Sequence, residues 1–63
     1  MEFDAVKDLL SEVLNAEETV LNTYIKIMRE TKSEDLKKEI LQIARDEERH
    51  IKNAKEMLRI LQE

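Results

Sequence analysis

The 63-residue chain contains no cysteine, no proline and no glycine. The lack of cysteine excludes disulfide bonds and thiolate metal ligands. Its only aromatic residues are Phe3 and Tyr24. Below about 70–80 residues a single hydrophobic core rarely supplies more than a few kcal/mol. With disulfides excluded, we expect a metal ion, an oligomer or both to supply the rest of the stability.

Charge and hydropathy exclude several classes of partner. The formal net charge is −4, which argues against a nucleic-acid-binding surface. No apolar run approaches the ~20 residues of a membrane span. The start, MEFDAV, has no basic segment followed by an apolar stretch, so no secretory signal is visible. We therefore expect a cytoplasmic protein without a nucleic-acid or membrane partner.

The composition predicts two long helices. Charged residues make up 41% of the chain, and the abundance of Leu, Ile, Glu, Lys and Arg is typical of helices. We expect one all-α unit over residues 1–63, with helices at about 4–30 and about 33–61. Thr31 and Ser33 between them are both good N-cap residues. A connection this short predicts an antiparallel hairpin.

An apolar seam runs along each predicted helix, in steps that alternate four and three residues. The first comprises Val6, Leu10, Val13, Glu17, Val20, Tyr24 and Ile27. The second comprises Leu36, Ile40, Ile43, Glu47, His50, Ala54, Met57 and Leu61. The flanking apolar residues are Leu9, Leu14, Leu21 and Met28, then Leu41, Ala44, Ile51 and Leu58. This heptad pattern predicts a packed helical bundle.

Each seam is interrupted near its middle by groups that can bind a metal ion. Glu17 lies 15 residues before a turn near residue 32, and Glu47 lies 15 residues after it. We therefore expect Glu17, Glu47 and His50 to face one another at one level. A carboxylate in a dry core needs a partner, and neither seam contains Lys or Arg. A metal cation is the simplest counter-charge.

The ligand count predicts a dimer. A Glu from one helix and a Glu-x-x-His from another make half of the ligand set of di-iron carboxylate bundles, which use four helices. Glu17 with Glu47 and His50 supplies that half. A two-fold homodimer or a multiple of it would supply the whole. We expect the hairpin to dimerise into a ferritin-like four-helix bundle.

Two segments carry a resemblance to known families. The stretch from Ala16-Glu17 to Tyr24 resembles a metal-binding helix of rubrerythrins, and IARDEERH, ending at His50, resembles the rubrerythrin helix that ends in Glu-Glu-Arg-His. The two-helix layout over about residues 10–58 is similar to the encapsulated ferritin-like proteins, whose subunits pair to build a ferroxidase site. Rubrerythrins also carry a four-cysteine module that this chain lacks. No shell-targeting tail follows Leu61, which leaves association with a protein shell unsupported.

The resemblance implies the role of each residue. Glu47 would be a bridging or chelating carboxylate, His50 a terminal nitrogen ligand and Glu17 the carboxylate of the facing helix. Tyr24 would be a phenol just outside the metal ligands that supports catalysis, either by a hydrogen bond to a metal carboxylate or by protection against radicals. Together they imply two iron ions per dimer, with manganese as the alternative, and oxidation of Fe(II) by O2 or peroxide. Ferroxidase activity and peroxide reduction use the same ligands, so the sequence does not separate them.

Purely structural interpretations, without metal binding, stay open for the same residues. Glu17 alone could set the helix register, His50 could be a hydrogen-bonded boundary residue, and Tyr24 could be core packing. On that interpretation the chain is a non-catalytic hairpin that dimerises as a scaffold or adaptor, with or without a structural metal ion.

Overall fold

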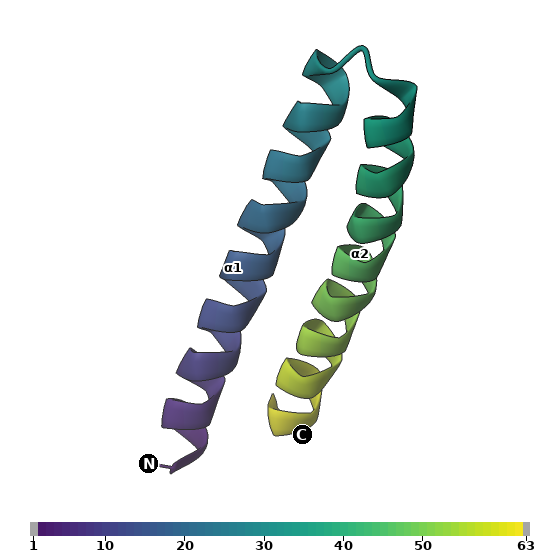
Figure 1. Cartoon of the computed structure of the whole chain (residues 1–63). Helices are drawn as coiled ribbons and strands as arrows, with labels where there is room; N and C mark the ends of the chain where they lie inside the picture. The colour runs from purple at the N-terminus through teal and green to yellow at the C-terminus, as the bar shows by residue number, and fades with distance from the viewer. Residues whose placement is uncertain (1, 63) are drawn as a thin grey trace.

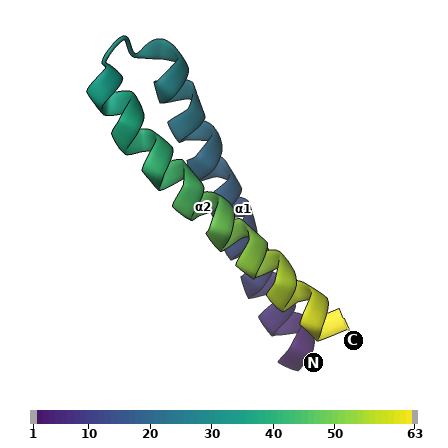
Figure 2. The same cartoon turned by 90° about the vertical axis from the view of Figure 1, so that its right-hand side faces the viewer.

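The computed structural model describes the backbone of residues 2–62 and the side chains of residues 4–62. It consists of helix α1, Glu2–Glu30, and helix α2, Glu34–Gln62, with no strand among the described residues. The helices run antiparallel, and the start of α1 and the end of α2 lie at the same end of the hairpin (Figures 1 and 2). The predicted all-α class and helix ranges are confirmed to within two residues. Neither described helix combines the length and hydropathy needed to cross a membrane.

The turn between the helices is closed by side-chain caps. The Ser33 Oγ accepts a hydrogen bond from the Leu36 N–H at 3.1 Å, and the Ser33 carbonyl accepts one from the Lys37 N–H at 3.0 Å. Ser33 is therefore the N-cap of α2. The second candidate, Thr31, accepts a bond from the Ser33 N–H at 3.1 Å through its Oγ1. No described residue has a positive φ angle, which explains how the turn forms without glycine.

The two helices pack through one side of each predicted seam. On α2, the buried residues Ile40, Ala44 and Ala54 form the centre of the contact. The half-buried apolar residues of α1 are Leu10, Leu14, Leu21, Tyr24, Ile25 and Met28. Three of these were predicted only as flanks of the seam. The hairpin interface is therefore rotated toward the flanking residues.

The other side of each seam is exposed. On α1 the exposed positions are Val6, Val13, Val20 and Ile27, and on α2 they are Leu36, Ile43 and Met57. We call these seven residues the open face. The chain exposes 5177 Å², whereas a folded monomer of 7.5 kDa is expected to expose about 4,200 Å². The excess of about 1,000 Å² is close to the ~800 Å² that one partner hides in a standard protein interface.

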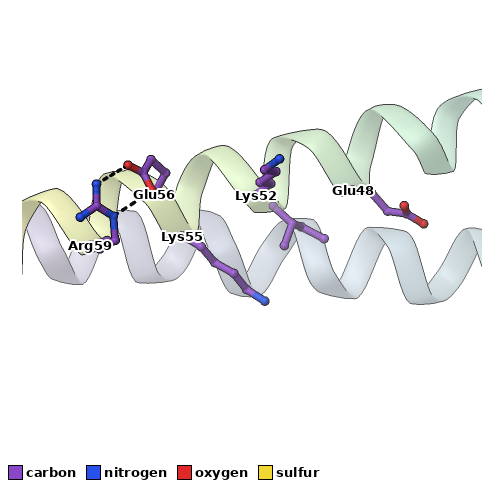
Figure 3. A pocket seen from close by; sticks show the side chains of 6 residues that line it. Glu48, Lys52, Lys55, Glu56 and Arg59 are labelled. Carbon is purple, nitrogen blue, oxygen red and sulfur yellow. Dashed lines mark hydrogen bonds and ion pairs between the residues drawn. The ribbon is translucent and has the colours of Figure 1, made fainter.

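The outer side of α2 is charged. A column of basic residues at intervals of seven is exposed throughout and consists of Lys38, Arg45, Lys52 and Arg59. A groove of about 460 Å³ on this side is lined by charged side chains around Ile51 (Figure 3). At its end, the Arg59 Nε and Nη2 donate to the Glu56 carboxylate at 3.0 and 2.6 Å. These hydrogen bonds lower the pKa of Glu56 below its ordinary value.

Candidate metal centre

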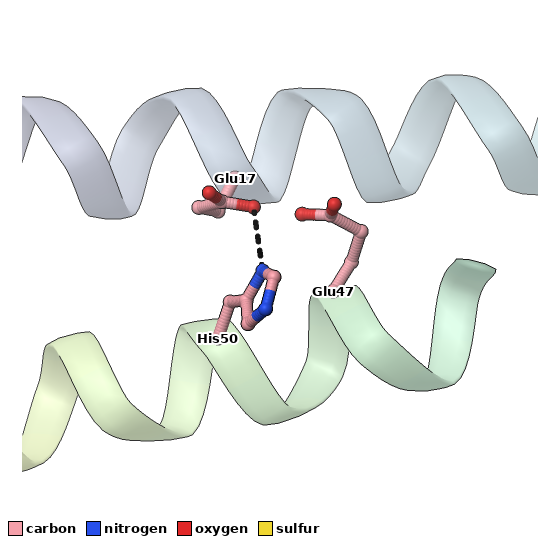
Figure 4. Close-up of side chains that lie close together, drawn as sticks. All are labelled: Glu17, Glu47 and His50. Atoms are coloured by element: carbon pink, nitrogen blue, oxygen red, sulfur yellow. Dashed lines mark ion pairs between the residues drawn. The ribbon is translucent and has the colours of Figure 1, made fainter.

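Three potential metal ligands meet midway along the hairpin. Glu17 comes from α1, and Glu47 and His50 come from α2 (Figure 4). Each offers one ligand atom, and these atoms all lie within 4.8 Å of one another. The sequence prediction that equal distance from the turn brings the three side chains together is confirmed. Ligation of a metal by them stays a prediction.

The local geometry follows from helix periodicity. Glu47 and His50 are three residues apart, which places them on neighbouring turns of one side of α2. The side chain of Glu17 is 27% exposed and that of His50 is 48% exposed. His50 takes the place between Ile43 and Met57 in the heptad column of the open face. The group is therefore closed by the hairpin on one side and open on the other.

Glu47 holds an oxygen that the chain itself does not satisfy. Its Oε2 is buried and has no hydrogen-bond partner among the described residues. A buried acceptor left unpaired costs about 1–3 kcal/mol, and more when it is charged. A cation placed between the three side chains would remove this penalty. This oxygen is the strongest indication of a missing ligand.

Glu17 and His50 also interact with each other, across the two helices. The Glu17 Oε2 lies 3.8 Å from the His50 Nδ1. This separation permits an ion pair when the imidazole is protonated, but it exceeds the length of a hydrogen bond. The pair therefore satisfies Glu17 in part and does nothing for the buried oxygen of Glu47.

The donor set fits a hard or borderline metal ion. Two ligand atoms that each lie about 2.1 Å from a metal are at most about 4.2 Å apart. Ligand atoms in adjacent octahedral positions are about 3.0 Å apart, so the observed limit of 4.8 Å calls for side-chain adjustments of up to about 2 Å. Two carboxylates and an imidazole suit iron or manganese. Glu17, Glu47 and His50 would fill three coordination positions and leave the others toward the open face.

Tyr24 is not part of this group. It is half-buried and lies seven residues after Glu17, about 10 Å further along the helix axis. No side-chain hydrogen bond among residues 4–62 involves its hydroxyl. Tyr24 instead lines a hollow of about 340 Å³ together with Thr19, Val20, Thr23 and Ile27. Its proposed role beside the metal ligands stays a prediction.

The hollow beside Tyr24 is a feature that we did not predict from the sequence. The signal was present, because Val20, Thr23, Tyr24 and Ile27 have the spacing of four residues that surround a hole on a helix surface. The heptad pattern predicted that Val20 lies in a seam. It did not predict that the space around Val20 is left unfilled by the residues of one chain.

Comparison of the chain with protein-family models, with curated proteins and with solved structures finds no match. The resemblance to rubrerythrins and encapsulated ferritin-like proteins therefore rests on the two motifs and on the two-helix layout. Any function has to be argued from the group formed by Glu17, Glu47 and His50 and from the surface around it.

Proposed function

We propose that this chain is a di-iron carboxylate protein of the ferritin-like type. Two copies would form a four-helix bundle and oxidise Fe(II) with O2 or peroxide at a site shared between them, with manganese as the alternative ion. The observation that carries the proposal is the buried, unpartnered oxygen of Glu47, set beside Glu17 and His50.

The second copy is needed for chemical and physical reasons. Di-iron bundles use four carboxylates and two histidines, and the cluster in one chain holds half of that set. An exposed apolar surface of several hundred Å² on a soluble protein indicates an interaction site. The open face has this character, and His50, at the edge of the cluster, lies between its residues Ile43 and Met57. A two-fold axis beside the cluster would complete the ligands and cover the apolar residues together.

Each residue then has a definite task. An iron pair, when bound, supplies the transfer of electrons from Fe(II) to O2 or peroxide. Glu17 and Glu47 would hold the cations by charge, and His50 would contribute a neutral nitrogen. His50 has to be deprotonated at the coordinating nitrogen, so metal binding displaces its ion pair with Glu17. Val13 and Val20 lie one turn to either side of Glu17 and would exclude water once covered.

A scaffold without metal is the second candidate. The ion pair between Glu17 and His50 at 3.8 Å favours it, because this pair gives both side chains a role in packing alone. The scaffold leaves the oxygen of Glu47 unsatisfied, whereas the metal site does not. It predicts no stoichiometric metal binding and tolerance of His50→Ala, at a cost no larger than that of an exposed ion pair.

Anaerobic titration with Fe(II), followed by calorimetry, tests the proposal. We expect one iron per chain, and we expect Glu47→Ala and His50→Ala each to lose at least tenfold in affinity. Glu18→Ala is the matched control, since Glu18 is an exposed neighbour of Glu17 outside the cluster. Equal affinity for the His50→Ala variant and the Glu18→Ala control would contradict the proposal.

A further inference from the structure

The hollow beside Tyr24 has the form of a packing site for a side chain. Val20, Thr23, Tyr24 and Ile27 stand at positions i, i+3, i+4 and i+7, the four residues that surround an inserted side chain in knobs-into-holes packing. The Thr23 Oγ1 donates to the Thr19 carbonyl at 2.9 Å, so its polar group is satisfied within the helix. The hollow therefore accepts an apolar side chain without leaving the Thr23 hydroxyl unpaired.

Leu9 is the exposed side chain that suits this hollow. At 61% exposure it is the most exposed large hydrophobic residue of the described chain. Leu9, Ala16 and Thr23 are seven residues apart, so they lie along one side of α1. Ala16 stands midway between Leu9 and Thr23 and is adjacent to Glu17. A small residue at this point allows two helices to approach closely.

Symmetry connects Leu9 to the hollow. This step rests on the proposed function, in which two copies share a site at the level of Glu17. A two-fold axis perpendicular to the helices at that level lays α1 antiparallel over the partner's α1. Ala16 then faces the partner's Ala16. Leu9, seven residues before the axis, comes level with the partner's Thr23, seven residues after it.

The alternative two-fold axis runs parallel to the helices and lays α1 over the partner's α2. Because Glu17 and Glu47 share a level, Thr23 then lies level with about residue 41 of the partner. On the exposed side of α2, the residues nearest to this level are Glu39, Gln42 and Ile43. Only Ile43 is apolar, and at 36% exposure it is already more covered by its own chain than Leu9, which is 61% exposed. Glu39 and Gln42 would stand beside it at the edge of the apolar hollow, where their polar groups are costly to desolvate.

The α2 helices favour the perpendicular axis as well. That axis passes close to Glu47 and brings Asp46 near the partner's Arg49. These residues already form an ion pair within each chain at 3.3 Å, and the two pairs would lie side by side with opposite charges adjacent. The parallel axis instead sets Asp46 opposite Ala16 and Thr19, which offer it no charge.

We infer that two copies of this chain pack with their α1 helices antiparallel, so that Leu9 of each copy fills the hollow at Thr23 of the other. Ala16 lies on the two-fold axis. The interaction surface thus has a defined occupant, which is a second copy, and a defined register.

Cysteine cross-linking tests this register, because the natural chain has no cysteine. A disulfide requires Cα atoms about 4.4–6.8 Å apart. Ala16→Cys alone should give a covalent dimer on oxidation. Leu9→Cys and Thr23→Cys chains, unfolded and refolded as a mixture, should give a mixed covalent dimer. Neither should do so alone, since the identical positions are 14 residues, about 21 Å, apart along the axis.

A mixture of Thr23→Cys and Gln42→Cys chains is the matched control for the parallel axis. We expect at least a tenfold lower yield of its cross-link than of the link between Leu9→Cys and Thr23→Cys chains. Preferential linkage of Thr23 to Gln42 would overturn the register. If such a dimer still binds one iron per chain, the proposed function survives. A monomer without cross-links overturns the register, and the same monomer without iron overturns the proposed function too.

Discussion

Glu47→Leu separates a metal ligand from a structural carboxylate. In the metal-free chain the buried Glu47 Oε2 has no hydrogen-bond partner. Removing it should recover about 1–3 kcal/mol per chain. In a dimer the variant also removes two of four carboxylates crowded at one level, where like charges repel one another. We therefore expect the metal-free variant to be more stable than the natural sequence.

The expected shift is large enough to measure. For a domain of this size, each kcal/mol changes the melting temperature by about 4–8 °C. The metal-free Glu47→Leu variant should therefore melt about 5–20 °C higher. Iron at 100 times its Kd should add about 2.7 kcal/mol to the natural sequence and almost nothing to the variant. Iron should thus narrow or reverse the difference in melting temperature between the natural sequence and the Glu47→Leu variant.

Thermal unfolding followed by circular dichroism, with chelator and then with anaerobic Fe(II), provides the assay. Chain concentration must be held constant, because the stability of a dimer depends on it. Glu48→Leu is the matched control, since Glu48 is the exposed neighbour of Glu47, and its shift should stay within about 0.5 kcal/mol. Strong destabilisation of metal-free Glu47→Leu would refute the reasoning, because Glu47 would then have a structural partner.

Three further outcomes follow from other parts of the hairpin. Val13→Glu, on the open face, should convert a dimer to a monomer in light scattering, whereas Asn15→Glu on the solvated side should not. Ser33→Ala removes the N-cap of α2 and should cost about 1 kcal/mol in thermal unfolding. Arg59→Ala should return the lowered pKa of Glu56 to its ordinary value in an NMR titration. Because the folded pKa is depressed, the stability that Glu56 adds is present above its unfolded pKa and lost as pH falls through the folded pKa.

The sequence predicted the fold and the cluster because both depend on simple periodicity. A period of seven residues defines the apolar side of each helix, and the position of the turn sets Glu17 level with Glu47. The lack of glycine did not obscure the turn, since Ser33 and Thr31 supply its hydrogen bonds. These relations need only spacing and capping chemistry.

The sequence could not predict which half of each seam closes the hairpin. Leu14 and Val13 are adjacent and equally apolar, yet Leu14 packs against α2 and Val13 is exposed. Which of these two side chains packs against α2 depends on the rotation of each helix about its own axis. That rotation is determined by how the side chains of the two helices fit together. The same rotation leaves His50 at the edge of the cluster, where sequence spacing alone had placed it in the core. It also opens the hollow beside Tyr24.

The central claim is that Glu17, Glu47 and His50 of two copies hold a pair of metal ions. Crystals of the iron-loaded protein, measured with X-rays on either side of the iron absorption edge, test it most directly. We predict two anomalous peaks per dimer, roughly 3.5–4 Å apart, each within bonding distance of these three side chains. A dimer without anomalous density at this position, from crystals grown with excess Fe(II), would contradict the claim.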